Sequence, residues 1–241
     1  MAPRRTALAV ALVAAIPLVV VAGGYLGRDH ASAHRLATVP LSASPSRVAV
    51  IGDSYTTGFR NTGRGAANWN ARTWRALAGR GLSVSPDVAA EGGAGYGVRG
   101  DHGDLFGDLT SRAVHPDDAL VVFFGSLNDR DVDPGYLRRL VADTVALARR
   151  ITPSARILVI GPPWPDADVP DKMWRIRDVV SAQAHDIGAR FVDPLAEGWF
   201  ADRPDLIGPD GVHPNDAGQA YLADKIVPLI ATELAGATQE P

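Results

Sequence analysis

The sequence predicts an α/β fold in which helices cover both faces of a parallel sheet. Three observations support this prediction. Short runs of β-branched residues alternate with longer segments of helical periodicity, the short runs are apolar without alternation, and 46% of the 241 residues are apolar. Strands that are apolar on both faces are buried on both faces, which requires helices on each side of the sheet and right-handed crossover connections. The composition is that of an ordered globular protein.

Five segments are predicted as strands. Four of them are short, continuous apolar runs, and a fifth is predicted near a stretch rich in Val and Ala. In chain order these segments are residues 47–51, 83–90, 119–124, 156–160 and 189–192.

Four longer segments are predicted as helices, namely residues 68–78, 134–150, 171–187 and 215–234. In the second of these, Leu137, Val141 and Val145 recur at the spacing of one buried helix face. The chain has no internal repeat and no break in composition beyond this point, so residues 47–241 are predicted to form one domain. Residues 34–46 are rich in Ser, Pro and Ala without periodicity, which predicts a linker.

Residues 1–33 are predicted to be a signal peptide or an N-terminal membrane anchor. Arg4 and Arg5 precede an uncharged, largely apolar stretch over residues 6–27. This stretch exceeds the about 7 to 15 apolar residues of a cleaved signal and approaches the roughly 20 that span a bilayer, while an A-x-A cleavage pattern ends at Ala33. A buried core helix is disfavoured because the stretch has no polar face. Both favoured alternatives predict an extracytoplasmic protein, secreted or anchored to the membrane.

Charge and composition exclude several function classes. With 24 basic and 27 acidic residues the chain has no basic surplus for nucleic-acid phosphates. Cysteine is absent, which excludes disulfides, thiolate nucleophiles and Cys-ligated zinc. No group of His and carboxylate residues has metal-ligand spacing, so we expect neither a metal nor another cofactor. The chemistry must come from oxygen and imidazole groups.

Ser54 is the candidate nucleophile. It follows the first predicted strand after Gly52 and Asp53, and in a parallel sheet the ligand crevice lies at the carboxyl ends of the strands. The alternative is that Asp53 or Ser54 only turns the chain or caps a short helix. A serine hydroxyl needs an imidazole to accept its proton.

His213 is the histidine best placed to do so. It ends the segment Pro-Asp-Gly-Val-His, in which Asp210 lies three residues earlier and can orient the ring so that Nε2 is free. The alternative is an ordinary turn followed by the start of the last helix. For His115 and His185 we expect structural or solvent-exposed roles.

Oxyanion donors are predicted after the second and third strands. Asn128 follows the third strand and lies at the same sheet edge as Ser54, where its amide could stabilise an oxyanion. The glycine-rich loop over residues 91–97 could supply a backbone N–H, because glycine allows close approach to a ligand. This loop lacks the spacing of a phosphate-binding loop, which disfavours nucleotide binding.

In their order and placement these segments resemble the four sequence blocks of the SGNH (GDSL-type) hydrolases. The blocks are Gly-Asp-Ser at residues 52–54, the glycine-rich loop, Asn128-Asp129, and Asp210 with His213. The resemblance implies a flavodoxin-like three-layer α/β/α sandwich and a metal-free esterase, lipase or deacetylase.

The resemblance also implies a role for each site residue. Ser54 is the nucleophile, His213 the base and Asp210 the acid that orients it. The oxyanion hole consists of the Ser54 N–H, the Gly93 N–H and the Asn128 side chain, with Gly92 as the alternative to Gly93. Two departures from the family pattern are Ser126 in the usual glycine position and Tyr55 where Leu is common, and neither removes a catalytic group.

The sequence therefore predicts an exported serine esterase that cleaves acyl groups from polysaccharide, glycolipid or lipid through an acyl-enzyme. We expect Asp53 and Asp129 to hold the loops in place. An acyltransferase acting on cell-envelope sugars or lipids, and a non-catalytic cell-envelope binding module, are the alternatives; the four intact blocks disfavour the second. Trp164, in a Pro-rich crevice loop, is predicted either to wall the substrate pocket or to pack within its loop. No long apolar lid is evident, which favours short acyl chains.

Overall fold

The computed structural model describes residues 44–60 and 62–237. Its centre is a five-stranded, all-parallel sheet with the strand order β2-β1-β3-β4-β5. This is the order of flavodoxin-like doubly wound folds, so the predicted fold class is confirmed. The strands are β1 (Ser46–Gly52), β2 (Val84–Ala90), β3 (Asp118–Phe124), β4 (Arg156–Ile160) and β5 (Arg190–Val192).

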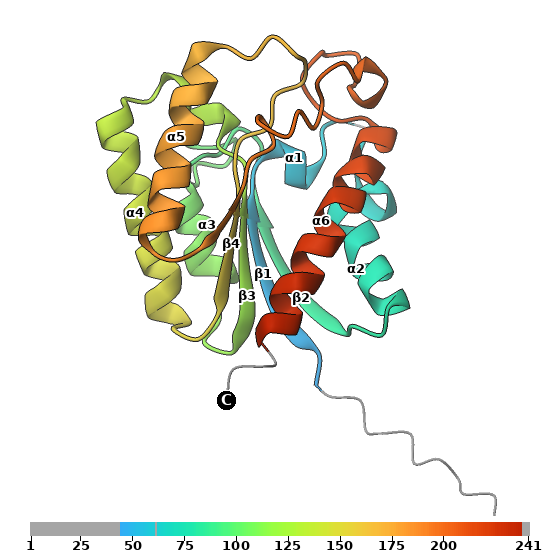
Figure 1. Cartoon of the computed structure of the whole chain (residues 1–241), viewed down its shortest axis with the longest axis vertical. Coiled ribbons are helices and arrows are strands. Elements are labelled where there is room, and N and C mark those ends of the chain that lie inside the picture. Colours follow the sequence, from blue (N-terminus) through green and yellow to red (C-terminus); the bar gives the residue numbers. More distant parts are fainter. Residues whose placement is uncertain (1–43, 61, 238–241) are drawn as a thin grey trace, which may run out of the picture. The chain divides into compact units, whose positions relative to one another are not determined.

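Helices form a layer on each face of the sheet, as Figure 1 shows. Helices α2 (Trp69–Gly79) and α6 (Asp216–Ala237) pack on one face. Helices α3 (Phe106–Ala113), α4 (Pro134–Ile151) and α5 (Asp171–Asp186) pack on the other. Short elements at the loops complete the set: α1 (Ser54–Thr57) and the 3-10 turns η1 (Gly65–Ala67), η2 (Leu127–Asp131) and η3 (Pro204–Leu206).

The central strands contribute side chains to two separate cores. In β1, Val48 and Val50 pack on the side of α2 and α6, whereas Ala49 and Ile51 pack on the side of α3, α4 and α5. All four are fully buried. Because successive strand residues point to opposite faces, an uninterrupted apolar run fills both cores at once. The prediction of strands buried on both faces is confirmed.

The predicted strands and helices are all present, with ends within three residues of those observed. The one error is α3, since we expected no helix after the glycine-rich loop. This helix has eight residues and includes Gly107, Thr110 and Ser111, which have low helix propensity. Its first turn is stabilised by the Asp108 carboxylate, which accepts the Leu105 N–H at 2.9 Å.

The N-terminal predictions are only partly within the described residues. The segment over residues 1–33 and most of the predicted linker lie outside them. Strand β1 begins at Ser46, the last residue of that predicted linker. Among residues 44–60 and 62–237, no helix is long and apolar enough to cross a bilayer.

Candidate active site

The loops after β1, β2 and β3 meet at one edge of the sheet, together with the loop before α6. They enclose a cavity of about 590 Å³. Its lining includes Ser54, Gly92, Gly93, Asn128 and His213. Residues from four distant parts of the chain are thus brought to the carboxyl ends of the strands, where ligands bind in doubly wound sheets.

Ser54 is positioned by a sharp turn from β1 into α1. Asp53 is extended and its Oδ1 accepts the Tyr55 N–H at 2.9 Å, so it caps the one-turn helix that Ser54 begins. A Cβ added at Gly52 would lie 2.2 Å from Thr56 Oγ1, which explains why glycine ends the strand. Capping by Asp53 and exposure of Ser54 to the cavity therefore occur together.

His213 links Ser54 to Asp210. Its Nε2 lies 3.0 Å from Ser54 Oγ, and its Nδ1 lies 2.8 Å from Asp210 Oδ2. The other carboxylate oxygen of Asp210 accepts the backbone N–H groups of Val212 and His213, both at 3.0 Å. The segment is a turn, as the alternative proposed, and the same turn aims the carboxylate at the ring.

The carboxylate of Asp210 is ionised over a wide pH range. Burial acts to raise its pKa, but the N–H groups of His213 and Val212 and the His213 ring outweigh burial and lower the pKa from 3.8 to about 2. The group is therefore a carboxylate at any pH at which His213 could act as a base. It can fix the Nδ1–H tautomer and stabilise a protonated ring.

Two aromatic residues hold His213 in place. The Phe59 ring stacks on the imidazole with centroids 3.9 Å apart and an interplanar angle of 7°. The buried Tyr55 hydroxyl donates to the Val212 carbonyl at 2.6 Å, which ties the histidine turn to α1. No sequence pattern indicated Phe59, and Tyr55 stood out only as a departure from the family pattern.

Asn128 lies in η2 with its amide beside the glycine-rich loop. Its Nδ2 donates to the Ala94 carbonyl at 2.8 Å, which uses one of its two N–H bonds and leaves the other for a ligand in the cavity. The next residue, Asp129, is fully buried and accepts the N–H groups of Tyr96 and Gly97 at 2.9 and 2.8 Å. Asp129 thus joins the loops after β2 and β3, as we expected.

Ser126 shows how the family's usual glycine position is filled here. Its φ is 97°, in the left-handed region that favours glycine. The Ser126 hydroxyl donates to Asp129 Oδ2 at 2.6 Å, a buried charge-assisted bond that offsets the backbone strain.

The peptide between Gly92 and Gly93 is oriented by the loop that follows it. The Gly92 carbonyl accepts the Asp101 N–H at 2.8 Å. Because the C=O and N–H of a trans peptide point in opposite directions, the Gly93 N–H points away from the Asp101 backbone. Among the described residues neither glycine N–H has an acceptor, so both are available to a ligand.

A family model decides the assignment. The model of the GDSL-like lipase/acylhydrolase family matches residues 50–221, a span that includes Ser54 and His213. The chain belongs to this family. It is similar to GDSL lipase Rv0518 of Mycobacterium tuberculosis, with 65% identity over 192 residues that cover 78% of this chain and 83% of that protein. The chain is thus an ester hydrolase, and the family resemblance predicted from the sequence is confirmed.

Solved structures of several esterases share the fold. TesA has 24% identity and a TM-score of 0.62 over 78% of this chain and 100% of its own. Esterase EstA from Pseudoalteromonas sp. has 14% identity and a TM-score of 0.60, covering 79% and 99% of the two chains. A family two carbohydrate esterase from Clostridium thermocellum has 19% identity and a TM-score of 0.63, covering 80% and 66%.

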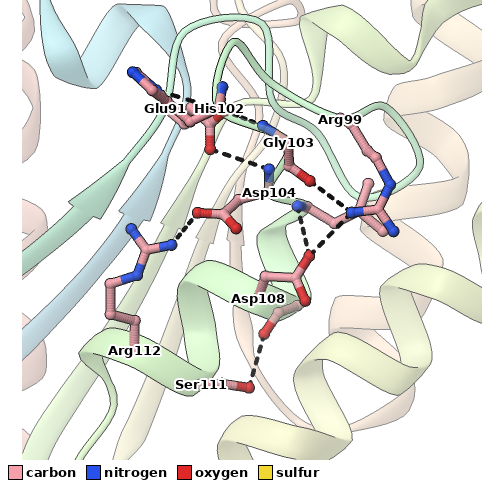
Figure 2. Close-up of polar contacts among 10 residues, drawn as sticks. Glu91, Arg99, His102, Gly103, Asp104, Asp108, Ser111 and Arg112 are labelled. Carbon is pink, nitrogen blue, oxygen red and sulfur yellow. Dashed lines mark hydrogen bonds and ion pairs between the residues drawn. The ribbon is translucent and has the colours of Figure 1, made fainter.

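A buried carboxylate at the end of β2 shapes one wall of the esterase's cavity. Glu91 is 3% exposed, and it accepts the backbone N–H groups of Gly103 at 2.9 Å and Asp104 at 3.2 Å as well as that of His102. Figure 2 shows these bonds together with the ion pair between Asp104 and Arg112. Glu91 therefore fixes the loop whose Asp101 N–H orients the Gly92–Gly93 peptide. Nothing in the sequence pattern singled out this role.

His115 and His185, the other histidines considered from the sequence, and Trp164 lie outside the cavity. The His115 ring lies 3.1 Å from Asp87, and the His185 ring bonds the Ser181 carbonyl on α5. Trp164 packs against the core on the side of α6 and does not line the cavity, which agrees with loop packing and not with a pocket wall. Among the described residues, no three His, Asp or Glu side chains form a group able to hold a metal ion.

Asp53 gives a testable pH dependence of stability. Burial, reinforced by the nearby Asp129 charge, raises its pKa from 3.8 to about 7. The folded enzyme then binds more protons than the unfolded chain between about pH 4 and pH 7, so this group lowers stability as the pH rises through that window. Asp53→Asn retains an acceptor for Tyr55 and removes the charge. From pH 4 to pH 8, we expect the variant to gain up to about 4 kcal/mol in unfolding free energy relative to wild type.

Urea unfolding of both proteins at the two pH values measures this difference. A difference in unfolding free energy that is the same at pH 4 and pH 8 would show that Asp53 is ionised in the folded enzyme throughout.

Proposed function

We propose that this protein is an exported serine esterase in which Ser54 attacks the ester, His213 is the general base and Asp210 orients His213. The observation that carries the proposal is the continuous contact from Asp210 Oδ2 to His213 Nδ1 and from His213 Nε2 to Ser54 Oγ, at 2.8 and 3.0 Å. These are the distances that proton transfer from a nucleophile to a base requires. The family assignment favours this enzyme over a non-catalytic binding module.

In the first half-reaction Ser54 Oγ bonds to the ester carbonyl carbon while its proton passes to His213 Nε2. The carbonyl oxygen becomes an oxyanion. When the intermediate collapses, the bond from carbon to the alcohol oxygen breaks, and His213 returns the proton to that oxygen. The alcohol leaves and the acyl group stays on Ser54.

In the second half-reaction a water molecule takes the place of the alcohol. His213 accepts a proton from the water as its oxygen bonds to the acyl carbon. Collapse of the second intermediate breaks the bond to Ser54 Oγ, and His213 gives the proton back to the serine. The carboxylic acid leaves and the enzyme is restored.

In both half-reactions we expect the oxyanion to accept hydrogen bonds from the second N–H of Asn128 and from the backbone N–H groups of Gly93 and Ser54. The family resemblance favours Gly93 over Gly92 as a donor, and the bond between the Gly92 carbonyl and the Asp101 N–H holds the peptide that carries the Gly93 N–H. Donors fixed by bonds to Ala94 and Asp101 cost no reorganisation when the charge develops.

Asn128→Ala is expected to lower kcat by roughly a hundredfold or more with little change in KM, because its amide would interact with the oxyanion more strongly than with the neutral ester. Asn128→Asp should be at least as impaired, since a carboxylate repels the oxyanion. Steady-state kinetics normalised to titrated active sites test this, with melting curves as the control for folding. A normal kcat in a folded Asn128→Ala enzyme would remove Asn128 from the oxyanion hole.

For the substrate we propose short acyl esters of small-molecule or carbohydrate alcohols. The sequence shows no long apolar lid, and charged side chains, among them Arg60, Arg64 and Asp101, form part of the cavity lining. The carbohydrate esterase among the similar structures supports a sugar alcohol, whereas the similar mycobacterial protein is named a lipase. Export is supported by the apolar stretch over residues 6–27.

A series of 4-nitrophenyl esters from acetate to dodecanoate tests the acyl preference. We expect kcat/KM to be highest for acetate to butyrate and to fall by at least about tenfold by decanoate, because a longer chain would extend past the cavity with no apolar lid to cover it. Ser54→Ala measured on the same series is the control for ester hydrolysis that does not depend on Ser54. A maximum at eight or more carbons would contradict the short-chain proposal.

A further inference from the structure

Two arginines line the same cavity as Ser54 and His213, and neither the triad nor the oxyanion hole uses them. They are Arg60 and Arg64, in the loop between α1 and η1. We propose that they select esters whose alcohol part carries an anionic group, a carboxylate or a phosphate. This inference rests on the proposed function, since it takes His213 to be the group that protonates the leaving alcohol.

The loop that carries the arginines is firmly anchored. Phe59 and Thr62 exchange backbone hydrogen bonds of 3.1 and 3.0 Å across a tight turn. The Gly63 N–H donates to Asp216 Oδ1 at 2.8 Å, and Asn68 Nδ2 donates to the Gly63 carbonyl at 2.8 Å. Arg60 lies within this turn with a φ of 51°, and its exposed side chain lines the cavity.

Both guanidinium groups lack a charged partner. Among residues 44–60 and 62–237, neither arginine forms an ion pair or a side-chain hydrogen bond. By contrast Arg156 and Arg190, which line a cavity of about 600 Å³ at the opposite ends of the strands, are both paired with Glu233. A guanidinium left unpaired in a substrate cavity can bind a carboxylate or phosphate through two parallel hydrogen bonds.

The Arg60 guanidinium and the His213 imidazole both lie against the Phe59 ring. The imidazole of His213 covers one face of Phe59 at 3.9 Å, and the Arg60 guanidinium lies over the same ring, 5.3 Å from its centroid. The leaving alcohol must lie next to His213 Nε2 to receive its proton. The leaving alcohol is therefore expected on the side of the cavity that holds His213, Phe59 and Arg60.

The acidic side chains of the cavity belong to a different loop from the two arginines. Asp101 and Glu91 belong to the loops that carry Gly92 and Gly93, and Glu91 is already bonded to three backbone N–H groups. The Asp101 carboxylate lies close to Gly92, since its Oδ2 would be 2.6 Å from a Cβ added at that glycine. An anionic group would be repelled by these carboxylates and attracted to the arginines.

The test compares two acetate esters of equal shape. In 3-acetoxybenzoate the phenol carries a carboxylate, and in 3-isopropylphenyl acetate an isopropyl group takes its place. We expect wild-type kcat/KM to be roughly tenfold or more higher for the anionic ester, the size of one charge-assisted hydrogen bond. The preference should shrink in about 1 M NaCl, a measurement that needs no variant.

The double variant Arg60→Gln, Arg64→Gln should lose this preference while kcat/KM for the neutral ester stays within about twofold. Arg80→Gln is the matched control, because Arg80 is exposed, lies at the far end of α2 and does not line the cavity. Melting curves confirm folding, and the two single variants replace the double variant if it is unstable.

The inference would be overturned if wild type showed no preference for the anionic ester, or if the preference survived in the folded arginine variants. It would also be overturned if a preference appeared only when the carboxylate is on the acyl part. Phenyl hydrogen glutarate compared with phenyl 5-methylhexanoate tests that case. Failure of the proposed function looks different. In that case Ser54→Ala would hydrolyse the neutral ester as fast as wild type does.

Discussion

Ser54→Ala and His213→Ala are each expected to lower kcat for ester hydrolysis by roughly 10⁴- to 10⁶-fold, the range that loss of a nucleophile or its base causes in serine hydrolases. Both side chains lie at the cavity, where Ser54 is 7% exposed, and they contact each other, Asp210 and the rings of Phe59 and Tyr55. Stability should therefore change little. Turnover of 4-nitrophenyl acetate and thermal melting of the same preparations measure the two effects.

The double variant Ser54→Ala, His213→Ala is the sharper control. If Ser54 and His213 act as one unit, removing both should cost about as much as removing one. Independent, multiplying losses would indicate that the two side chains do not share a proton. Loss of folding in either single variant would instead indicate that the residue serves packing.

Asp210→Asn is expected to reduce kcat by up to roughly 10⁴-fold, as in serine proteases with the same exchange. Asparagine can still accept the N–H groups of Val212 and His213 through one oxygen. It presents an NH₂ group to His213 Nδ1, however, so Nδ1 must become the acceptor and Nε2 carries the proton. A ring in this tautomer cannot take the proton of Ser54.

The pKa of about 2 for Asp210 extends this prediction, because wild type has a carboxylate at every pH from about 4 upward. The defect should be present over that whole range. Asp205→Asn is the matched control, since Asp205 is an exposed aspartate of the neighbouring η3 turn whose carboxylate forms an ion pair with Arg203. An unchanged rate in Asp210→Asn would leave Asp210 as a turn residue alone.

The parts of this molecule that could be predicted are those fixed by local pattern. Apolar runs such as residues 119–124 are long enough to mark a strand buried on both faces, whereas the flavodoxin-like arrangement of the strands was implied by the family resemblance. A residue at the carboxyl end of such a strand lies at the ligand crevice because of its position in the sheet alone. Ser54 and Asn128 could therefore be proposed before any contact was known.

What could not be predicted depends on contacts between distant segments. Phe59 and His213 are 154 positions apart, and neither neighbourhood indicates that their rings stack. Glu91 at the end of a strand would ordinarily be solvent-exposed, and only the folded loop shows that three N–H groups surround it. Helix α3 was missed because tertiary packing of Phe106 and Leu109 overrides the weak propensity of its other residues.

The most direct test of the account is to identify the residue that forms the covalent intermediate. The enzyme is treated with a fluorophosphonate, which reacts with activated serines, and the modified peptide is identified by mass spectrometry. The account predicts a single adduct at Ser54, abolished in Ser54→Ala and formed far more slowly in His213→Ala and Asp210→Asn. An adduct at another residue, or no adduct on folded enzyme that still hydrolyses esters, would contradict it.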